Sequence, residues 1–138
     1  MQEYLLSKAE EKVMIFLWEQ DRPLSVLEML EAWENVGGKS WTDNYMRAIV
    51  RSLEDKGALE FHDLDHRGSR YARRFRPTFS KREYFTYLAK RSGVKVSEMV
   101  EVEAVAMAQK GDREGMQALI HELEAIIEEY RTRGEDAR

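Results

Sequence analysis

The chain has 138 residues, a formal net charge of −4 and no cysteine, and 43% of its residues are hydrophobic. This composition excludes global disorder, disulfide bonds, thiolate metal sites and cysteine nucleophiles, and the length suits one domain or a small domain with an oligomerisation arm. No apolar run approaches the roughly 20 residues that a membrane span needs, and the first residues lack a signal peptide's basic start and apolar run. We therefore expect a cytoplasmic protein with no direct membrane insertion.

The acidic balance hides a basic block. Residues 1–38 and residues 95–138 each carry a net charge of −5, whereas residues 39–82 carry +5 from 11 basic and 6 acidic side chains. Binding to phosphate depends on such a local patch rather than on the overall charge. The basic block is therefore the candidate for a nucleic-acid-binding surface.

Two capping boxes, at residues 7–10 and 25–28, predict the first two helices. The first helix should run from about Lys8 to Glu19 and end at the break of residues 21–23. The second should run to about Asn35, before two glycines. Short helices with such tight connections are typical of the helix-turn-helix class.

The segment 41–57, WTDNYMRAIVRSLEDKG, predicts a third, amphipathic helix with Thr42 as its N-cap and Gly57 as its stop. One stripe should be buried: Met46, Ile49, Val50 and Leu53. The opposite side carries Asn44, Arg47, Ala48 and Arg51. Arginine can bind guanine, and asparagine adenine, through two hydrogen bonds each. On its own the pattern favours an ordinary solvated helix face, and the following segment changes that balance.

Two stretches, 58–64 and 70–76, alternate like strands around a turn at residues 65–69. Apolar residues should face the helices: Leu59, Phe61, Tyr71 and Phe75. The other face of the second strand carries Arg70, Arg74 and Arg76. This alternation, directly after a helix-turn-helix, predicts a DNA-binding wing. The alternative is a basic edge strand that resists aggregation.

The C-terminal third should be helical. A capping box at residues 80–83 predicts a helix from Lys81 to about Ser92, and further helices should span 96–109 and the residues after a break at 110–112. The apolar faces of the last two helices must fold back on the N-terminal part or pair with another copy, and we expect pairing. The expected dimerisation residues are Met99, Val100, Met116, Leu119, Ile120, Leu123, Ile126, Ile127 and Tyr130. The tail from Thr132 should be frayed.

The expected fold is mainly α with a small β-hairpin: a winged helix-turn-helix domain over residues 1–80, then a helical linker and dimerisation region over 81–138. A two-fold dimer with two recognition helices would match a palindromic operator with half-sites roughly 34–36 Å apart.

Three stretches of the chain resemble the penicillinase-repressor family of bacterial winged-helix regulators. They are SKAEEKVMIFLWE (7–19), WTDNYMRAIVRSLEDKGALEF (41–61) and YARRFRPTFSKREYF (71–85). The resemblance implies a dimeric repressor that binds operator DNA. In the family's best-understood branch, a membrane sensor protease triggers cleavage of the dimerisation region. The implied DNA contacts are Thr42, Asn44, Tyr45, Arg47, Ala48, Arg67, Gly68 and Arg70.

The chain also departs from the family. Tyr45 stands where many members have a small hydroxyl residue, so the operator sequence does not transfer. The C-terminal cysteines of the copper-responsive branch are absent, which argues against copper sensing. The asparagine–phenylalanine bond cleaved in the β-lactam-responsive branch has no equivalent between Val94 and Gln109, which weakens the inference of proteolytic induction.

Other chemistry finds little support in the sequence. His62, Asp63, Asp65 and His66 are metal-ligand types, but they lie at a predicted turn where such residues are usually solvated, so no metal or cofactor is expected. No phosphate loop, nucleophile elbow or zinc-protease motif is present, and we expect no enzyme. Besides a repressor, two alternatives remain open. They are a winged-helix adaptor that binds an acidic protein, and a repressor released by a small ligand.

Overall fold

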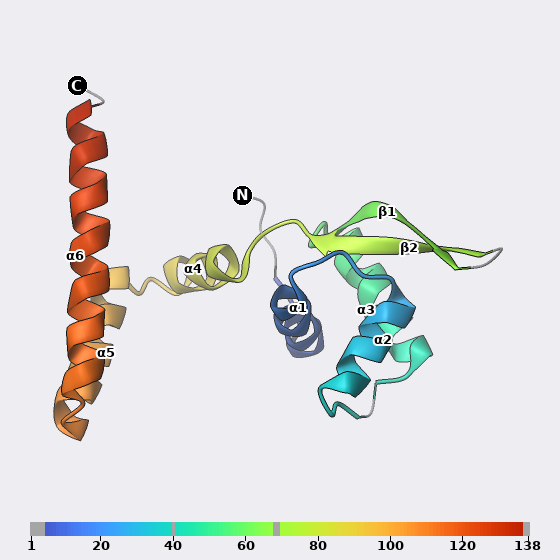
Figure 1. The fold of residues 1–138 in the computed structure, drawn as a ribbon, viewed down its shortest axis with the longest axis horizontal. Helices are drawn as coiled ribbons and strands as arrows, with labels where there is room; N and C mark the ends of the chain where they lie inside the picture. The colour runs from blue at the N-terminus through green and yellow to red at the C-terminus, as the bar shows by residue number, and fades with distance from the viewer. Residues whose placement is uncertain (1–4, 40, 68–69, 137–138) are drawn as a thin grey trace. The chain divides into compact units, whose positions relative to one another are not determined.

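The computed structural model describes residues 5–39, 41–67 and 70–136. These residues form helices and one two-stranded β-hairpin (Figure 1). The chain divides into two compact units within the fourth helix, after Phe85. None of the helices in the described parts is both long and apolar enough to span a bilayer. In chain order the elements are α1 (Lys8–Gln20), α2 (Val26–Asn35), α3 (Asp43–Asp55), β1 (Leu59–Arg67), β2 (Arg70–Pro77), α4 (Lys81–Arg91), α5 (Val96–Lys110) and α6 (Arg113–Asp136).

The helices begin where the sequence predicted. At α1, the Ser7 hydroxyl accepts from the backbone N–H of Glu10, and the Glu10 carboxylate accepts from the N–H of Ser7 at 2.8 Å. The same reciprocal pair opens α2 and, with Ser80 and Glu83, opens α4. These local bonds satisfy backbone donors that would otherwise lack partners, which is why the boundaries follow the capping boxes.

The first unit has a closed hydrophobic core beneath the hairpin. Each of the three helices contributes one apolar stripe, and side chains from the base of the hairpin complete the core. Its most buried members include Val13, Met14, Leu24, Met29, Met46, Leu53 and Leu59, none of which is more than 2% exposed. This core holds α3 with its apolar stripe inwards.

The backbone of the hairpin is hydrogen-bonded to the helices at its base. The backbones of Leu24 and Phe75 exchange two hydrogen bonds of 3.0 and 2.9 Å, which tie β2 to the connection between α1 and α2. Phe75 and Leu59 are buried, as predicted. Phe61 and Tyr71, in contrast, are 46% and 65% exposed, so their predicted inward packing is wrong. Phe61 lies opposite Phe75 and has the Arg73 guanidinium over its ring, whereas Tyr71 lies opposite His66, further towards the tip of the hairpin.

A β-bulge shifts the strand register between Phe61 and Asp63. Beyond the bulge, Leu64 lies opposite Arg73, and His66 lies opposite Tyr71. β1 continues to Arg67, so the turn predicted over 65–69 is wrong for its first residues, which belong to the ladder. A bulge inserts one residue into a strand and reverses the side-chain alternation beyond it, so a simple two-residue period missed it.

The second unit consists of the end of α4 and the hairpin of α5 and α6. Gly111 closes α5 in the left-handed conformation, with φ of 70°. No residue from Thr86 to Gly134 is fully buried. The predicted fraying from Thr132 is wrong for the described residues, because α6 continues to Asp136. An ion pair between Arg133 and Glu129, one turn apart, supports this last part, and adding residues to an existing helix is favourable.

Candidate nucleic-acid interface

The outward side of α3 carries the predicted reading residues. Asn44, Tyr45, Arg47, Ala48 and Arg51 are all exposed. Thr42 is the N-cap, and its hydroxyl oxygen accepts a 3.1 Å hydrogen bond from the backbone N–H of Tyr45. An exposed asparagine and two arginines along one side of a helix are suitable groups for base edges and phosphates.

A buried carboxylate fixes α3 from behind. Glu10 on α1 is 3% exposed, and it accepts hydrogen bonds from the Ser52 hydroxyl at 2.7 Å and from Lys56 Nζ at 2.6 Å. Burial alone would raise the pKa of Glu10, but the hydrogen bonds from Lys56, Ser7 and Ser52 outweigh it and lower the pKa to about 2. The carboxylate is therefore ionised at neutral pH and holds the C-terminal half of α3 against α1.

An aromatic cluster holds the segment of chain that leads into α3. The rings of Trp33 and Trp41 stack with centroids 3.8 Å apart, and Phe16 meets both rings edge-on. Trp33 Nε1 also donates to the backbone oxygen of Lys39 at 3.3 Å. Both tryptophans are therefore packing anchors, and they place the start of α3.

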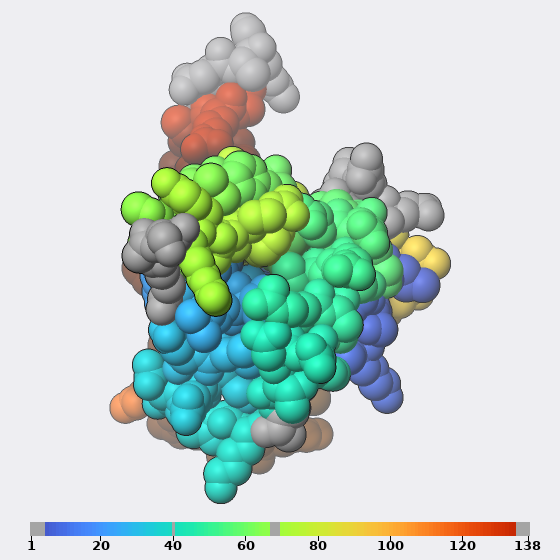
Figure 2. All heavy atoms as spheres, turned by 90° about the vertical axis from the view of Figure 1, so that its right-hand side faces the viewer, coloured from blue at the N-terminus to red at the C-terminus, as the bar shows by residue number. Residues whose placement is uncertain are grey.

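A cleft of about 520 Å³ separates α3 from the wing. Figure 2 shows this side of the first unit, with the green hairpin above α2 in blue and α3 in blue-green. Four arginines and one glutamate supply the charges that line the cleft: Arg47, Arg51, Arg70, Arg73 and Glu54. The cations come from two separate elements and meet in one hollow, which is the arrangement that a polyanion requires.

The arginines of the cleft differ in what they contact. Arg47 forms a surface ion pair with Asp43, one turn earlier on α3, and Arg73 forms one with Glu54. Arg51 and Arg70 make no ion pair with any residue that the structure describes. Exposed pairs contribute little to stability, so Arg47 can exchange Asp43 for a ligand at small cost.

On the outer face of the wing, which was predicted to carry Arg70, Arg74 and Arg76, two of these arginines are paired with carboxylates. Arg74 forms a two-pronged contact with Asp63 at 2.8 and 3.1 Å, and Arg76 contacts Glu60 at 2.7 Å. These carboxylates project from the neighbouring strand. The Arg74–Asp63 pair depends on the strand register after the bulge, which the sequence pattern did not reveal, whereas Glu60 lies opposite Arg76 before the bulge.

The remaining predicted wing residues stand as follows. Arg70 is exposed at the start of β2. The side chain of Arg67 and all of Gly68 lie outside the described residues. Two cleft residues, Arg73 and Tyr71, were not predicted from the sequence. The ring of Tyr71 stacks on His66 with centroids 4.5 Å apart. The signal was present in the sequence, since Arg73 and Tyr71 share a strand face with Phe75, but that face was assigned to the core.

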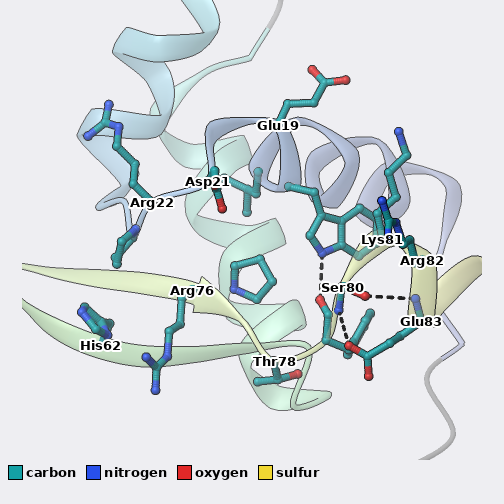
Figure 3. Close-up of a pocket in the computed structure, with 15 residues that line it drawn as sticks. Glu19, Asp21, Arg22, His62, Arg76, Thr78, Ser80, Lys81, Arg82 and Glu83 are labelled. Carbon is teal, nitrogen blue, oxygen red and sulfur yellow. Dashed lines mark hydrogen bonds between the residues drawn. The ribbon is translucent and has the colours of Figure 1, made fainter. Parts of the chain in front are cut away.

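A second hollow, of about 1060 Å³, lies where the end of α1, the base of the hairpin and the start of α4 meet (Figure 3). The Trp18 indole nitrogen donates to the backbone oxygen of Phe79 at 2.8 Å beside it. The charged side chains that line this hollow have both signs: Arg22, Arg76, Lys81 and Arg82 with Glu19, Asp21 and Glu83. Opposite charges share this surface, so the cleft beside α3 is the better candidate for a polyanion.

The predicted dimerisation residues lie on α5 and α6. Five of them are exposed: Met99, Ile120, Ile126, Ile127 and Tyr130. The other four are half-buried: Val100, Met116, Leu119 and Leu123. An apolar surface of this extent along one helical hairpin is typical of a protein interface.

The chain matches a known family model. The family model described as penicillinase repressor matches residues 6–129, from before α1 into the second half of α6. Among the curated proteins that were compared, none matches the chain.

Proposed function

This chain belongs to the penicillinase repressor family, and from that premise we propose that it is a dimeric repressor that binds a palindromic operator through α3 and the wing. Family membership supports a DNA-binding transcriptional repressor. The observation that carries the finer proposal is the cleft between α3 and β2, where Arg47 and Arg51 meet Arg70 across a hollow. Asn44 and Arg47 would contact bases, while Arg67 and Arg70 would hold phosphates.

Dimerisation is part of the proposal because the second unit has no core of its own. Val102 is 70% exposed and Tyr130 is 59% exposed, so the α5–α6 hairpin leaves large apolar side chains in water. Pairing with a second copy would cover them, and a two-fold axis would present two copies of α3 to two half-sites.

The resemblance also implies a partner that ends repression, and we include a membrane sensor protease in the proposal on that basis. Cleavage that separated the second unit would leave each wing domain with one half-site and so weaken binding to the operator. The connection between α4 and α5 is exposed over Ser92–Lys95. Mass spectrometry of the repressor from induced cells would locate the cut.

The central test is selection from a random pool of double-stranded DNA, followed by salt titration of the enriched sequence. We expect an inverted repeat with half-site centres about one helical turn apart or a multiple of it, and an affinity that falls steeply with salt. A winged-helix adaptor for an acidic protein would enrich no sequence. That result would refute the proposed function.

A further inference from the structure

One ion pair crosses the cleft and joins the recognition helix to the wing. Arg73 on β2 contacts Glu54 on α3 through both ends of its guanidinium, with Nη2–Oε2 at 2.6 Å and Nη1–Oε1 at 3.3 Å. Among the residues that the structure describes, this is the only side-chain hydrogen-bonded link between α3 and β2. The parallel, two-point geometry fixes orientation as well as distance.

Both ends of the link are anchored. On the wing, the guanidinium of Arg73 lies over the rings of Phe61 and Phe75, at 5.3 and 5.0 Å from their centroids. On the helix, the turns around Glu54 are held to α1, because Ser52 and Lys56 both contact Glu10. A planar guanidinium that stacks and pairs at once is rigid, whereas a lysine in its place would not be.

The position of the pair is unusual for a surface that binds DNA. Glu54 contributes a carboxylate to a cleft whose other charged side chains are arginines, and a negative charge there opposes the approach of phosphate. If Arg73 acted as a phosphate ligand, Glu54 would compete with the DNA for it. The presence of Glu54 is understandable if the Glu54–Arg73 pair sets the distance between α3 and the wing.

We propose that Glu54 and Arg73 are positioning residues, which hold the wing at the spacing from α3 that double-stranded DNA requires. Arg73 then acts through the wing, and Arg70 and Arg51 on either side of the cleft remain available for the DNA backbone. The inference rests on the proposed function, because it assigns a role within the same interface.

A positioning role and a charge-masking role for Glu54 predict opposite effects of Glu54→Gln on operator binding. As a positioning residue, its loss should weaken operator binding by about fivefold or more, without a steeper salt dependence. If Glu54 only masks a phosphate-binding arginine, the variant should bind more tightly and with a steeper salt slope. That outcome would overturn the proposal.

Arg73→Lys gives a second measurement, because it keeps the positive charge and removes the fork and the ring stacking. We expect it to weaken binding about as much as Glu54→Gln, and the double variant to be no weaker than either single one. Full operator affinity of Arg73→Lys, or additive losses in the double variant, would refute the positioning role.

Glu60→Gln is the matched control, since Glu60 pairs with Arg76 on the outer face of the same hairpin. It should leave operator binding unchanged, and thermal unfolding of each variant should show that the fold is retained. The two proposals fail in different ways. A wild-type protein with no preferred DNA sequence refutes the proposed function. If wild type binds an operator and Glu54→Gln binds it with equal affinity, only the positioning role is refuted.

Discussion

The carboxylate of Glu10 on α1 accepts a 2.6 Å hydrogen bond from Nζ of Lys56, the residue that caps the C-terminus of α3. The two residues are 46 positions apart in sequence, and the pair sits behind the helix whose outer face carries the proposed reading residues. The Glu10 side chain is buried and that of Lys56 is 39% exposed, so removal of Lys56 would leave a buried carboxylate without its charged partner. The pair therefore defines the orientation of α3.

This ion pair should make the fold sensitive to acid. The folded-state pKa of Glu10 is about 2, below its ordinary value of 4.5, so its contribution is complete above about pH 4.5 and is lost as the pH falls towards 2. The contribution should be about 3 kcal/mol of unfolding free energy. Urea unfolding at pH values from 2 to 7 would measure it.

The variant Glu10→Gln should be less stable than wild type at pH 7 and should show a flatter acid dependence between pH 4.5 and 2. Glu19→Gln, at an exposed position of the same helix, is the control and should follow the wild-type curve. Parallel acid curves for wild type and Glu10→Gln would show that the pair does not contribute as described.

Gly38 should not tolerate a side chain. A β-carbon at this position would overlap the Trp33 indole, which stacks on Trp41 at the entry to α3. We expect Gly38→Ala to displace the stack and to lower the unfolding free energy by about 1–3 kcal/mol. Gly37→Ala is a useful comparison, because it meets no atom but has φ of 79°, so its cost is backbone strain alone. Tryptophan fluorescence should change in the first variant and not in the second.

Two arginines of the cleft should differ in how they affect recognition. Arg47→Ala should cost about 1–3 kcal/mol on the selected operator and relax its sequence preference, because the side chain would contact a base. Arg70→Ala should weaken binding to all sequences alike and lower the salt slope by about 1. Arg82→Ala, beside the other hollow, should bind DNA as wild type does. Equal affinity of all three variants for the operator would disprove the assignment.

The apolar surface of α6 should control self-association. Ile127 is 50% exposed, and Ile127→Glu would bury an unpaired carboxylate in the proposed dimer, at a cost of several kcal/mol. We expect sedimentation velocity to show a monomer at concentrations where wild type is a dimer, with weaker operator binding. Gln117→Glu places the same charge at an exposed polar position of α6 and should remain dimeric. A wild-type protein that sediments as a monomer would contradict the dimer directly.

Local signals in the sequence were sufficient to predict where three of the helices begin. Ser7, Ser25 and Ser80 each pair with a glutamate three positions later, and both partners of each cap belong to one turn of chain. The apolar stripe of α3 and the exposure of Arg47 and Arg51 followed from helical periodicity in the same way. The family resemblance noted from three short stretches was confirmed by a match over almost the whole chain.

The tertiary structure alone decided which charges are paired between elements and which aromatic rings are covered. The bulge after Phe61 set the register that brings Asp63 to Arg74, and the short reach of the core left Tyr71 exposed in the cleft. Glu10 contacts residues 42 and 46 positions away in sequence, and Arg73 contacts a residue 19 positions away. Periodicity predicts on which side of a helix or strand a residue lies. Which residue of another element it contacts depends on how the elements pack, and that is a property of the folded chain.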